Sequence, residues 1–146
     1  MAGNAHPFLA DGCGWQAIDT KAVDFAFEGM PETLEAGTSV LTIENASEAG
    51  ELHEVVLIKV TDEAADMSVE DILSLPEDEA MAYADPASPP VAAFAAPGAS
   101  GGVSVELTPG RYIYSCFIPV GTTSMEAPGS GQPHFMEGMA GELTVT

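Results

Sequence analysis

The chain ends in a run that places an imidazole and a thioether five residues apart at the start of a strand-like segment, His134-Phe-Met-Glu-Gly-Met139-Ala-Gly-Glu-Leu-Thr-Val145. Two more metal-binding side chains lie upstream, His53 in an apolar run and Cys116 in Tyr-Ile-Tyr-Ser-Cys-Phe-Ile-Pro. Two imidazoles, a thiolate and a weak axial thioether form a type 1 copper site, because soft sulfur suits Cu(I) while imidazole suits both oxidation states. The sequence therefore predicts one copper ion, with the ligands His53, Cys116, His134 and Met139.

Three segments of the chain resemble the cupredoxin family, above all plastocyanins and the halocyanins of halophilic archaea. The C-terminal run matches the family ending of His, four residues, Met, then x-Gly-x-aliphatic-x-Val. Leu41-Thr-Ile-Glu-Asn45 to Leu52-His-Glu-Val-Val56 looks like the plastocyanin strand, turn and first ligand histidine. The resemblance covers roughly residues 38–60 and 102–146. It implies an all-β, Greek-key β-sandwich with one type 1 copper.

Two features differ from the plastocyanin pattern. Only a few residues separate the ligand Cys from the second His in plastocyanins, whereas here residues 117–133 intervene, rich in Gly, Pro, Ser and Thr. Plastocyanins usually carry Asn after the first His, where it ties the ligand loops together, and here that place is Glu54. We therefore expect a non-standard ligand loop and a different hydrogen-bonding environment for His53.

Charge dominates the composition. The 146 residues are enough for one domain, 1–146, with a substantial core. Three Lys and Arg residues stand against 23 acidic ones, which gives a formal net charge of −20. This charge repels nucleic acid and anionic lipid, so a macromolecular partner should be basic. Self-repulsion also opposes folding unless salt screens it, which suits a halophilic or saline source.

The location of the protein is inferred from the family. No stretch of the sequence approaches the roughly 20 apolar residues of a membrane span, and no basic segment with an apolar core marks a signal peptide. The compartment typical of the resembled family predicts an exported protein, periplasmic, extracellular or at the cell surface. Its signal or anchor would then lie outside this sequence.

Several segments have the period of two that is typical of strands. Val23, Phe25 and Phe27 alternate with less apolar residues, which predicts a strand with one buried face. Residues 39–45 and 54–60 predict two more strands, and the unbroken Val-Val-Leu-Ile of the second indicates burial on both faces.

A hairpin is predicted around the turn Thr108-Pro-Gly110, between residues 103–107 and 111–117. Its second strand would place Tyr112, Tyr114 and Cys116 on one face. The thiol would then emerge beneath aromatic residues at the end of a rigid strand.

The acidic segment 61–90 has a different character. Ser68-Val-Glu-Asp71 resembles a capping box, with acidic residues in the first turn where they favour the helix dipole. We predict a short helix that ends near Pro76 and a second one over 77–83, so that a helical insertion occupies 66–84 or so. We interpret it as a cap over the open side of the sandwich rather than a dedicated docking site.

Two assignments within the site have alternatives. Cys13 could pair with Cys116 in a disulfide, which would occupy the thiol and abolish the copper site. Met136 competes with Met139 for the axial position, but the sequence after Met139 continues into the last strand as in the resembled family. The remaining apolar residues near the second histidine predict a small docking rim for a redox partner, formed by Pro133, Phe135 and Met136.

Enzyme classes fit this sequence poorly. Catalytic copper centres need several additional histidines, and the chain has three in all. No nucleophile elbow, phosphate loop or dinucleotide fingerprint is present. We therefore predict a non-enzymatic one-electron carrier that cycles between Cu(II) and Cu(I). The alternative is a cupredoxin-like interaction module, either metal-free or carrying copper for storage or delivery, which a long flexible ligand loop would suit.

Overall fold

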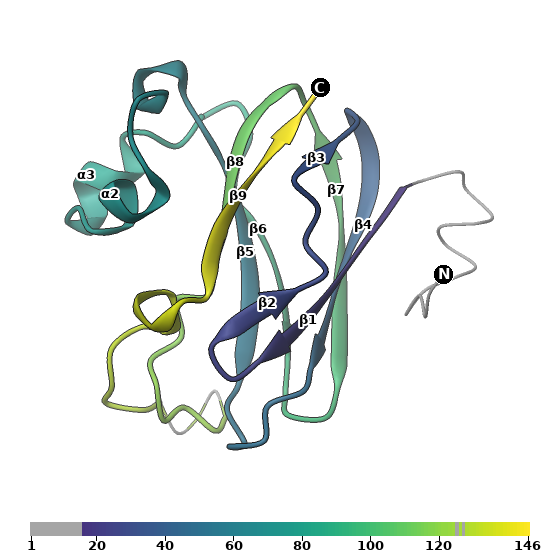
Figure 1. Cartoon of the computed structure of the whole chain (residues 1–146), viewed down its shortest axis with the longest axis vertical. Helices are drawn as coiled ribbons and strands as arrows, with labels where there is room; N and C mark the ends of the chain where they lie inside the picture. Colours follow the sequence, from purple (N-terminus) through teal and green to yellow (C-terminus); the bar gives the residue numbers. More distant parts are fainter. Residues whose placement is uncertain (1–15, 125, 127) are drawn as a thin grey trace.

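The computed structural model, which describes residues 16–124, 126 and 128–146, contains two β-sheets packed face to face (Figure 1). The first sheet consists of β1 (Gln16–Val23), β2 (Ala26–Glu28), β4 (Gly37–Asn45) and β7 (Ser100–Leu107). The second consists of β3 (Thr33–Leu34), β5 (His53–Val60), β6 (Val91–Ala95), β8 (Gly110–Ser115) and β9 (Ala140–Val145).

The two sheets have the strand orders β2-β1-β4-β7 and β3-β9-β8-β5-β6. The pairs β1–β4 and β3–β9 are parallel, and the other paired strands are antiparallel. The predicted all-β sandwich is confirmed. β8 lies between β5 and β9. The start of β5 at His53, the end of β8 before Cys116 and the start of β9 after Met139 therefore lie side by side.

The core between the sheets follows from the alternation of apolar residues along the strands. Leu41 and Ile43 from the first sheet pack against Val55, Leu57 and Leu143 from the second, and all five are buried. Burying a side chain of this size stabilises the fold by roughly 1.5–3 kcal/mol. The core cluster continues to Cys116 and Met139 at one end of the sandwich, so the predicted sulfur ligands are part of the packed interior.

The strand predicted across Val23, Phe25 and Phe27 is wrong. The chain turns within this segment, because Phe25 has a φ of +82° and its N–H donates to the Val23 carbonyl at 2.8 Å. The hydrogen bond closes a tight turn over Asp24 and Phe25, which joins β1 to β2 as a hairpin with Val23 opposite Ala26. The alternation is real on both sides of the turn, which is why the pattern did not reveal it.

The hairpin predicted around Thr108-Pro-Gly110 is also wrong. Both strands exist, but β7 pairs with β4 in the first sheet, whereas β8 pairs with β5 and β9 in the second. The turn therefore carries the chain from one sheet to the other. Tyr112 secures this crossing, because its hydroxyl accepts a hydrogen bond from the Thr108 N–H at 3.1 Å. Tyr112 and Cys116 nevertheless share the inward face, as predicted.

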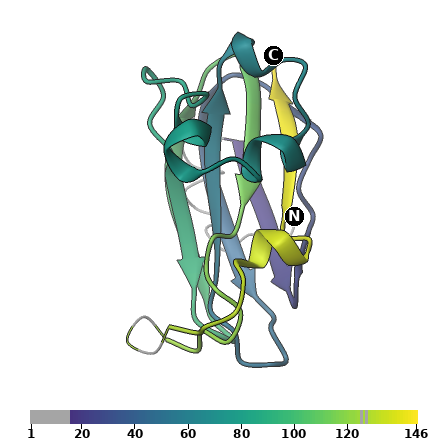
Figure 2. The ribbon, with the colours of Figure 1, turned by 90° about the vertical axis from the view of Figure 1, so that its left-hand side faces the viewer.

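The predicted helical insertion is confirmed. It contains the 3₁₀ turn η1 (Asp62–Ala64) and the helices α2 (Val69–Leu73) and α3 (Glu77–Met81), and the Ser68 hydroxyl caps α2 by accepting from the Asp71 N–H at 3.0 Å. The insertion covers the outer face of the second sheet (Figure 2).

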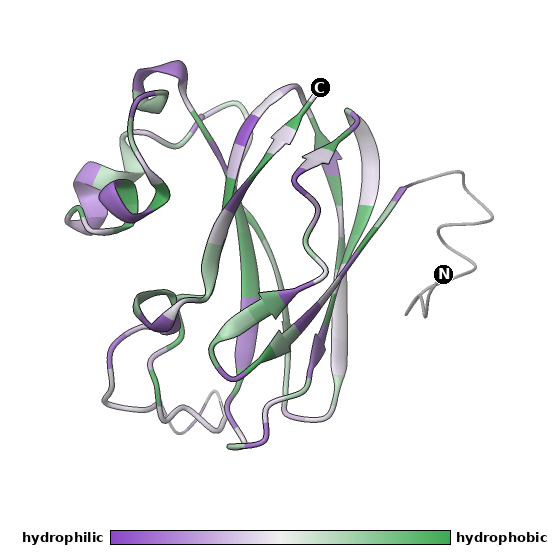
Figure 3. Cartoon of the chain, in the orientation of Figure 1, coloured by the Kyte–Doolittle hydropathy of each residue, from purple (hydrophilic) through white to green (hydrophobic). Residues whose placement is uncertain are grey.

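The helices of the insertion contain both hydrophilic and hydrophobic residues (Figure 3). Ile72 is buried against Val60 and Ile113. This cover explains the unbroken apolar run of β5: Val55 and Leu57 face the core, while Val56 and Ile58 are half-buried beneath the insertion. None of the helices in the described residues is both long and apolar enough to traverse a bilayer.

Candidate metal centre

Three potential metal ligands from distant parts of the chain meet at one end of the sandwich. His53 begins β5, Cys116 directly follows β8, and His134 begins the short 3₁₀ helix η2 (His134–Glu137). One donor atom from each of the three lies within 4.8 Å of the others, and each residue is fully buried. The structure therefore brings together three of the four side chains that the sequence predicted as ligands.

Cys116 supplies a buried thiol. It forms no disulfide within the described residues, and its sulfur lies 3.3 Å from Nδ1 of His134. Burial raises the pKa of the thiol to about 11, and the backbone N–H groups of Glu54 and Ile118 partly oppose that rise. The same N–H groups can stabilise the thiolate once a metal ion displaces the proton. Cys13, the other half of the alternative disulfide, lies outside the described residues.

His134 is oriented by a buried carboxylate. Its Nε2 lies 2.8 Å from Oε1 of Glu51, and the side chains are 0% and 8% exposed. The Gly121 N–H donates to the same carboxylate oxygen at 2.8 Å. Because a carboxylate accepts, Nε2 carries the proton, and the lone pair of Nδ1 is left facing the Cys116 sulfur. The contact fixes both the ring and the tautomer that metal binding through Nδ1 requires.

His53 has a different environment. Neither of its ring nitrogens makes a hydrogen bond, although Nε2 lies 3.5 Å from Oδ1 of Asp24. Burial, followed by the nearby His134, lowers the pKa of His53, so the imidazole is neutral at pH 7. The centroids of the His53 and His134 rings are 4.7 Å apart. A buried polar side chain without a partner is uncommon, and a bound metal ion would satisfy it.

The long segment between Cys116 and His134 folds back on itself. The His134 N–H donates to the Ile118 carbonyl at 2.9 Å, and the Val120 N–H donates to the Gln132 carbonyl at 2.9 Å. These backbone bonds form a short ladder that returns the chain to its starting point. The two ligands therefore meet despite their separation in the sequence, and the non-standard loop predicted for 117–133 is an ordered one at its base.

The remaining contacts tie the ligand segments together. Glu54 occupies the place of the plastocyanin Asn, and its carboxylate accepts from the Phe117 N–H at 3.2 Å. Burial raises the pKa of Glu54. Met139 is fully buried, its carbonyl accepts from the Cys116 N–H at 3.1 Å, and its N–H donates to the His134 carbonyl at 3.2 Å. Met136, the competing axial candidate, is 59% exposed.

Comparison with solved structures shows the same architecture in the auracyanins. Auracyanin B shares 27% sequence identity over 90% of this chain and 88% of its own, with a TM-score of 0.53. A dithionite-reduced auracyanin from the photosynthetic bacterium Roseiflexus castenholzii shares 22% identity over 90% and 97% of the two chains, with a TM-score of 0.53.

Auracyanin A, described as a blue copper protein of the green thermophilic photosynthetic bacterium Chloroflexus aurantiacus, shares 20% identity over 89% and 98%, with a TM-score of 0.51. The chain has the cupredoxin fold. No family model and no curated protein sequence matches it. The cupredoxin neighbours together with the buried His–Cys–His group support a blue copper protein.

The donor set of this site fits copper. A thiolate beside two neutral imidazoles suits both Cu(I) and Cu(II), and all three donors are shielded from water. Nδ1 of His53 has no hydrogen-bond partner among the described residues, whereas Nε2 lies near Asp24. A bound metal ion would satisfy Nδ1.

Sequence reasoning missed the two carboxylates beside His53 and His134. Glu51 precedes His53 by two residues but contacts His134, and Asp24 lies in the turn between β1 and β2. No motif marks either residue. Composition shows that the chain has 23 acidic residues, but it does not show which of them lie beside the histidines.

Proposed function

We propose that the protein is a type 1 copper protein that carries single electrons, with His53, Cys116 and His134 as the equatorial ligands and Met139 as the axial one. The observation that supports it best is the buried group of one thiol and two imidazoles, one of which has no hydrogen-bond partner. Bound copper would supply the one-electron couple between Cu(II) and Cu(I).

The chain's own residues supply position and rigidity. Pairing with β6 fixes the backbone at His53, and pairing of β8 with β5 fixes it just before Cys116. The loop ladder and Glu51 fix His134. A site whose ligands cannot move loses little energy to rearrangement when the metal charge changes. Met139 packs in the same core cluster as Cys116, which supports it over the exposed Met136 as the axial residue.

The partners in this proposal are basic redox proteins that dock near Pro133, Phe135 and Met136. Export to the periplasm, the cell surface or the medium belongs to the same proposal, as does a saline source. The alternative role in copper storage relied on a flexible ligand loop, and the backbone ladder at the base of that loop does not favour it.

Cyclic voltammetry of the copper-loaded protein tests the proposal. We expect one reversible one-electron wave with equal anodic and cathodic currents. A protein that loses copper on reduction would instead be a delivery protein, and one that takes up no copper would be an interaction module. Either result would contradict the proposed function.

A further inference from the structure

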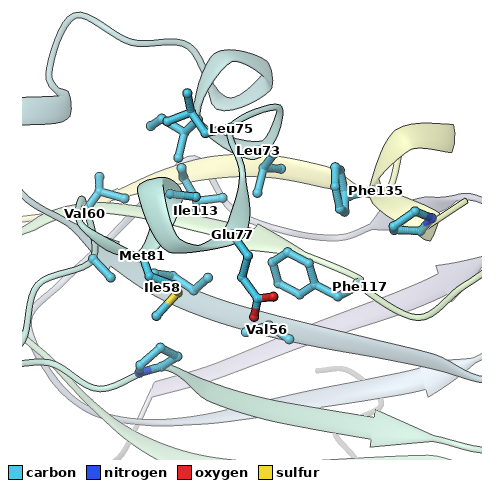
Figure 4. Close-up of a pocket in the computed structure, with 15 residues that line it drawn as sticks. Val56, Ile58, Val60, Leu73, Leu75, Glu77, Met81, Ile113, Phe117 and Phe135 are labelled. Carbon is cyan, nitrogen blue, oxygen red and sulfur yellow. The ribbon is translucent and has the colours of Figure 1, made fainter.

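A groove of about 500 Å³ lies between the helical insertion and the outer face of the second sheet. Val56 and Ile58 of β5 line one side, Leu73 and Met81 of the helices line the other, and Phe117 closes the end nearest the metal centre (Figure 4). Met81 is 48% exposed and Phe117 is 37% exposed, so the groove opens to solvent. Its size and apolar walls suit a long side chain of another molecule.

Two residues that line the groove each follow a proposed metal ligand directly in the sequence. Phe117 follows Cys116 and Phe135 follows His134, and both aromatic rings line the groove. The two rings pack edge to face, with their centroids 5.5 Å apart. The Phe135 N–H donates to the Cys116 carbonyl at 2.9 Å. His134 itself is fully buried behind Glu51. On this face the centre is therefore bordered by the exposed ring of Phe117 and the half-buried ring of Phe135.

The groove contains a single charged residue, Glu77. Its carboxylate is directed between Phe117 and Val56 (Figure 4). Within the described residues Glu77 has no ion-pair partner. Residues 62–79 around it include eight acidic residues and no Lys, Arg or His. The groove thus combines an apolar wall with a lone carboxylate and a strongly negative surround.

This combination selects one kind of occupant. The aliphatic stem of a Lys or Arg packs on an apolar wall while its charge meets a carboxylate, and a cation is also attracted to the face of an aromatic ring. A neutral apolar molecule would desolvate Glu77 without compensation. A second copy of this chain would bring one net charge of −20 against another.

We propose that the groove receives a Lys or Arg side chain of a basic redox protein, which docks on the acidic insertion and the Phe117–Phe135 pair. The proposal rests on the proposed electron-transfer function and extends the predicted rim, since Pro133 and Phe135 line the groove. It also gives a docking role to the insertion, which we interpreted from the sequence as a cap only. In the exchange the reduced partner would give up one electron and bound Cu(II) would take it up, with no bond or proton transferred.

Stopped-flow reduction by a basic c-type cytochrome at low ionic strength tests the location of docking. Glu77→Gln and Glu106→Gln each remove one negative charge, but Glu106 lies on β7 of the other sheet. We expect Glu77→Gln to lower the second-order rate constant about fivefold and Glu106→Gln to lower it less than about twofold. Equal effects of the two changes would overturn the proposal.

Two further measurements separate this proposal from the function on which it rests. Reduction by ascorbate should be the same in all variants, and a failure of wild-type copper to cycle with ascorbate would contradict the electron-transfer function alone. The metal-free protein, titrated with the cytochrome and followed by amide NMR shifts, should respond at the groove, and Ala80→Trp, which fills it, should abolish the response. Shifts confined to other surfaces, or self-association that Ala80→Trp removes, would overturn the groove assignment.

Discussion

The two imidazoles of the centre are held in unequal ways. His134 donates to a buried carboxylate, whereas His53 has a carboxylate at 3.5 Å and no hydrogen bond. A carboxylate that accepts from the ring nitrogen not bound to the metal makes the imidazole a stronger donor and favours the more highly charged metal ion. Glu51 should therefore stabilise Cu(II) as well as orient the ring.

Replacing Glu51 by Gln tests this electrostatic role. The amide oxygen can still accept from His134 and from the Gly121 N–H, so the geometry is preserved while the charge is lost. We expect the reduction potential to rise by about 50 mV, which is roughly 1 kcal/mol, with little change in the absorption spectrum. Glu48→Gln, an exposed acid in the same loop, is the matched control. Equal shifts in the two variants would mean that only the total charge matters.

The axial position is tested by Met139→Leu. Removing the thioether weakens donation to Cu(II) more than to Cu(I), so the potential should rise while copper and colour are retained. Met136→Leu should change it much less, because Met136 is 59% exposed. Voltammetry of both variants decides the matter. A larger shift for Met136→Leu would mean that Met136, and not Met139, is the axial ligand.

At the scale of elements, the sequence predicted what depends on local pattern and missed what depends on pairing. The strands at 39–45 and 54–60 and both short helices were predicted from alternation and capping. The tight turn at Asp24 and Phe25 interrupts an alternation that continues on both sides of it. A Pro-Gly turn looks the same whether the next strand stays in its sheet or crosses to the other, so the hairpin error was unavoidable.

The metal site shows the same division. His53, Cys116 and His134 were predicted from residue type and order, and the structure brings them together. Glu51 could not be predicted, because its contact with His134 spans 83 residues and depends on how the long loop returns.

The base of the ligand loop offers an element-scale test. A Cβ added to Gly129 would lie 2.2 Å from the Val120 carbonyl oxygen, too close for the backbone to tolerate. We therefore expect Gly129→Ala to push the two sides of the loop apart and weaken copper binding at least about tenfold. Competition with a copper chelator measures it. Ser130→Ala changes an exposed neighbour and should have no effect. Unchanged affinity in Gly129→Ala would mean that the loop does not position His134.

At the scale of the whole molecule, repulsion among like charges opposes folding in addition to the loss of conformational entropy. Lys59 pairs with Asp85 at 3.7 Å and Arg111 pairs with Glu142, but three cations cannot neutralise 23 acids. Most of the surface therefore carries charge of one sign, which raises the energy of the compact state.

Thermal unfolding in potassium chloride tests that account. The midpoint should rise by roughly 5 °C between low salt and about 1 M, because the screening length falls to about 3 Å. Most of the rise should occur below about 0.5 M, since screening saturates, whereas salting-out strengthens apolar burial steadily with concentration. A midpoint that does not change with salt would contradict a repulsion-limited fold.

The central claim is that Cys116 binds copper as a thiolate between two histidines. A visible absorption titration of the metal-free protein with Cu(II) tests it most directly, because charge transfer from a cysteine sulfur to Cu(II) gives an intense blue or green band. We predict that the band saturates at one equivalent, disappears in Cys116→Ser and persists in Cys13→Ser. A colourless adduct, or a band that survives the loss of Cys116, would contradict it.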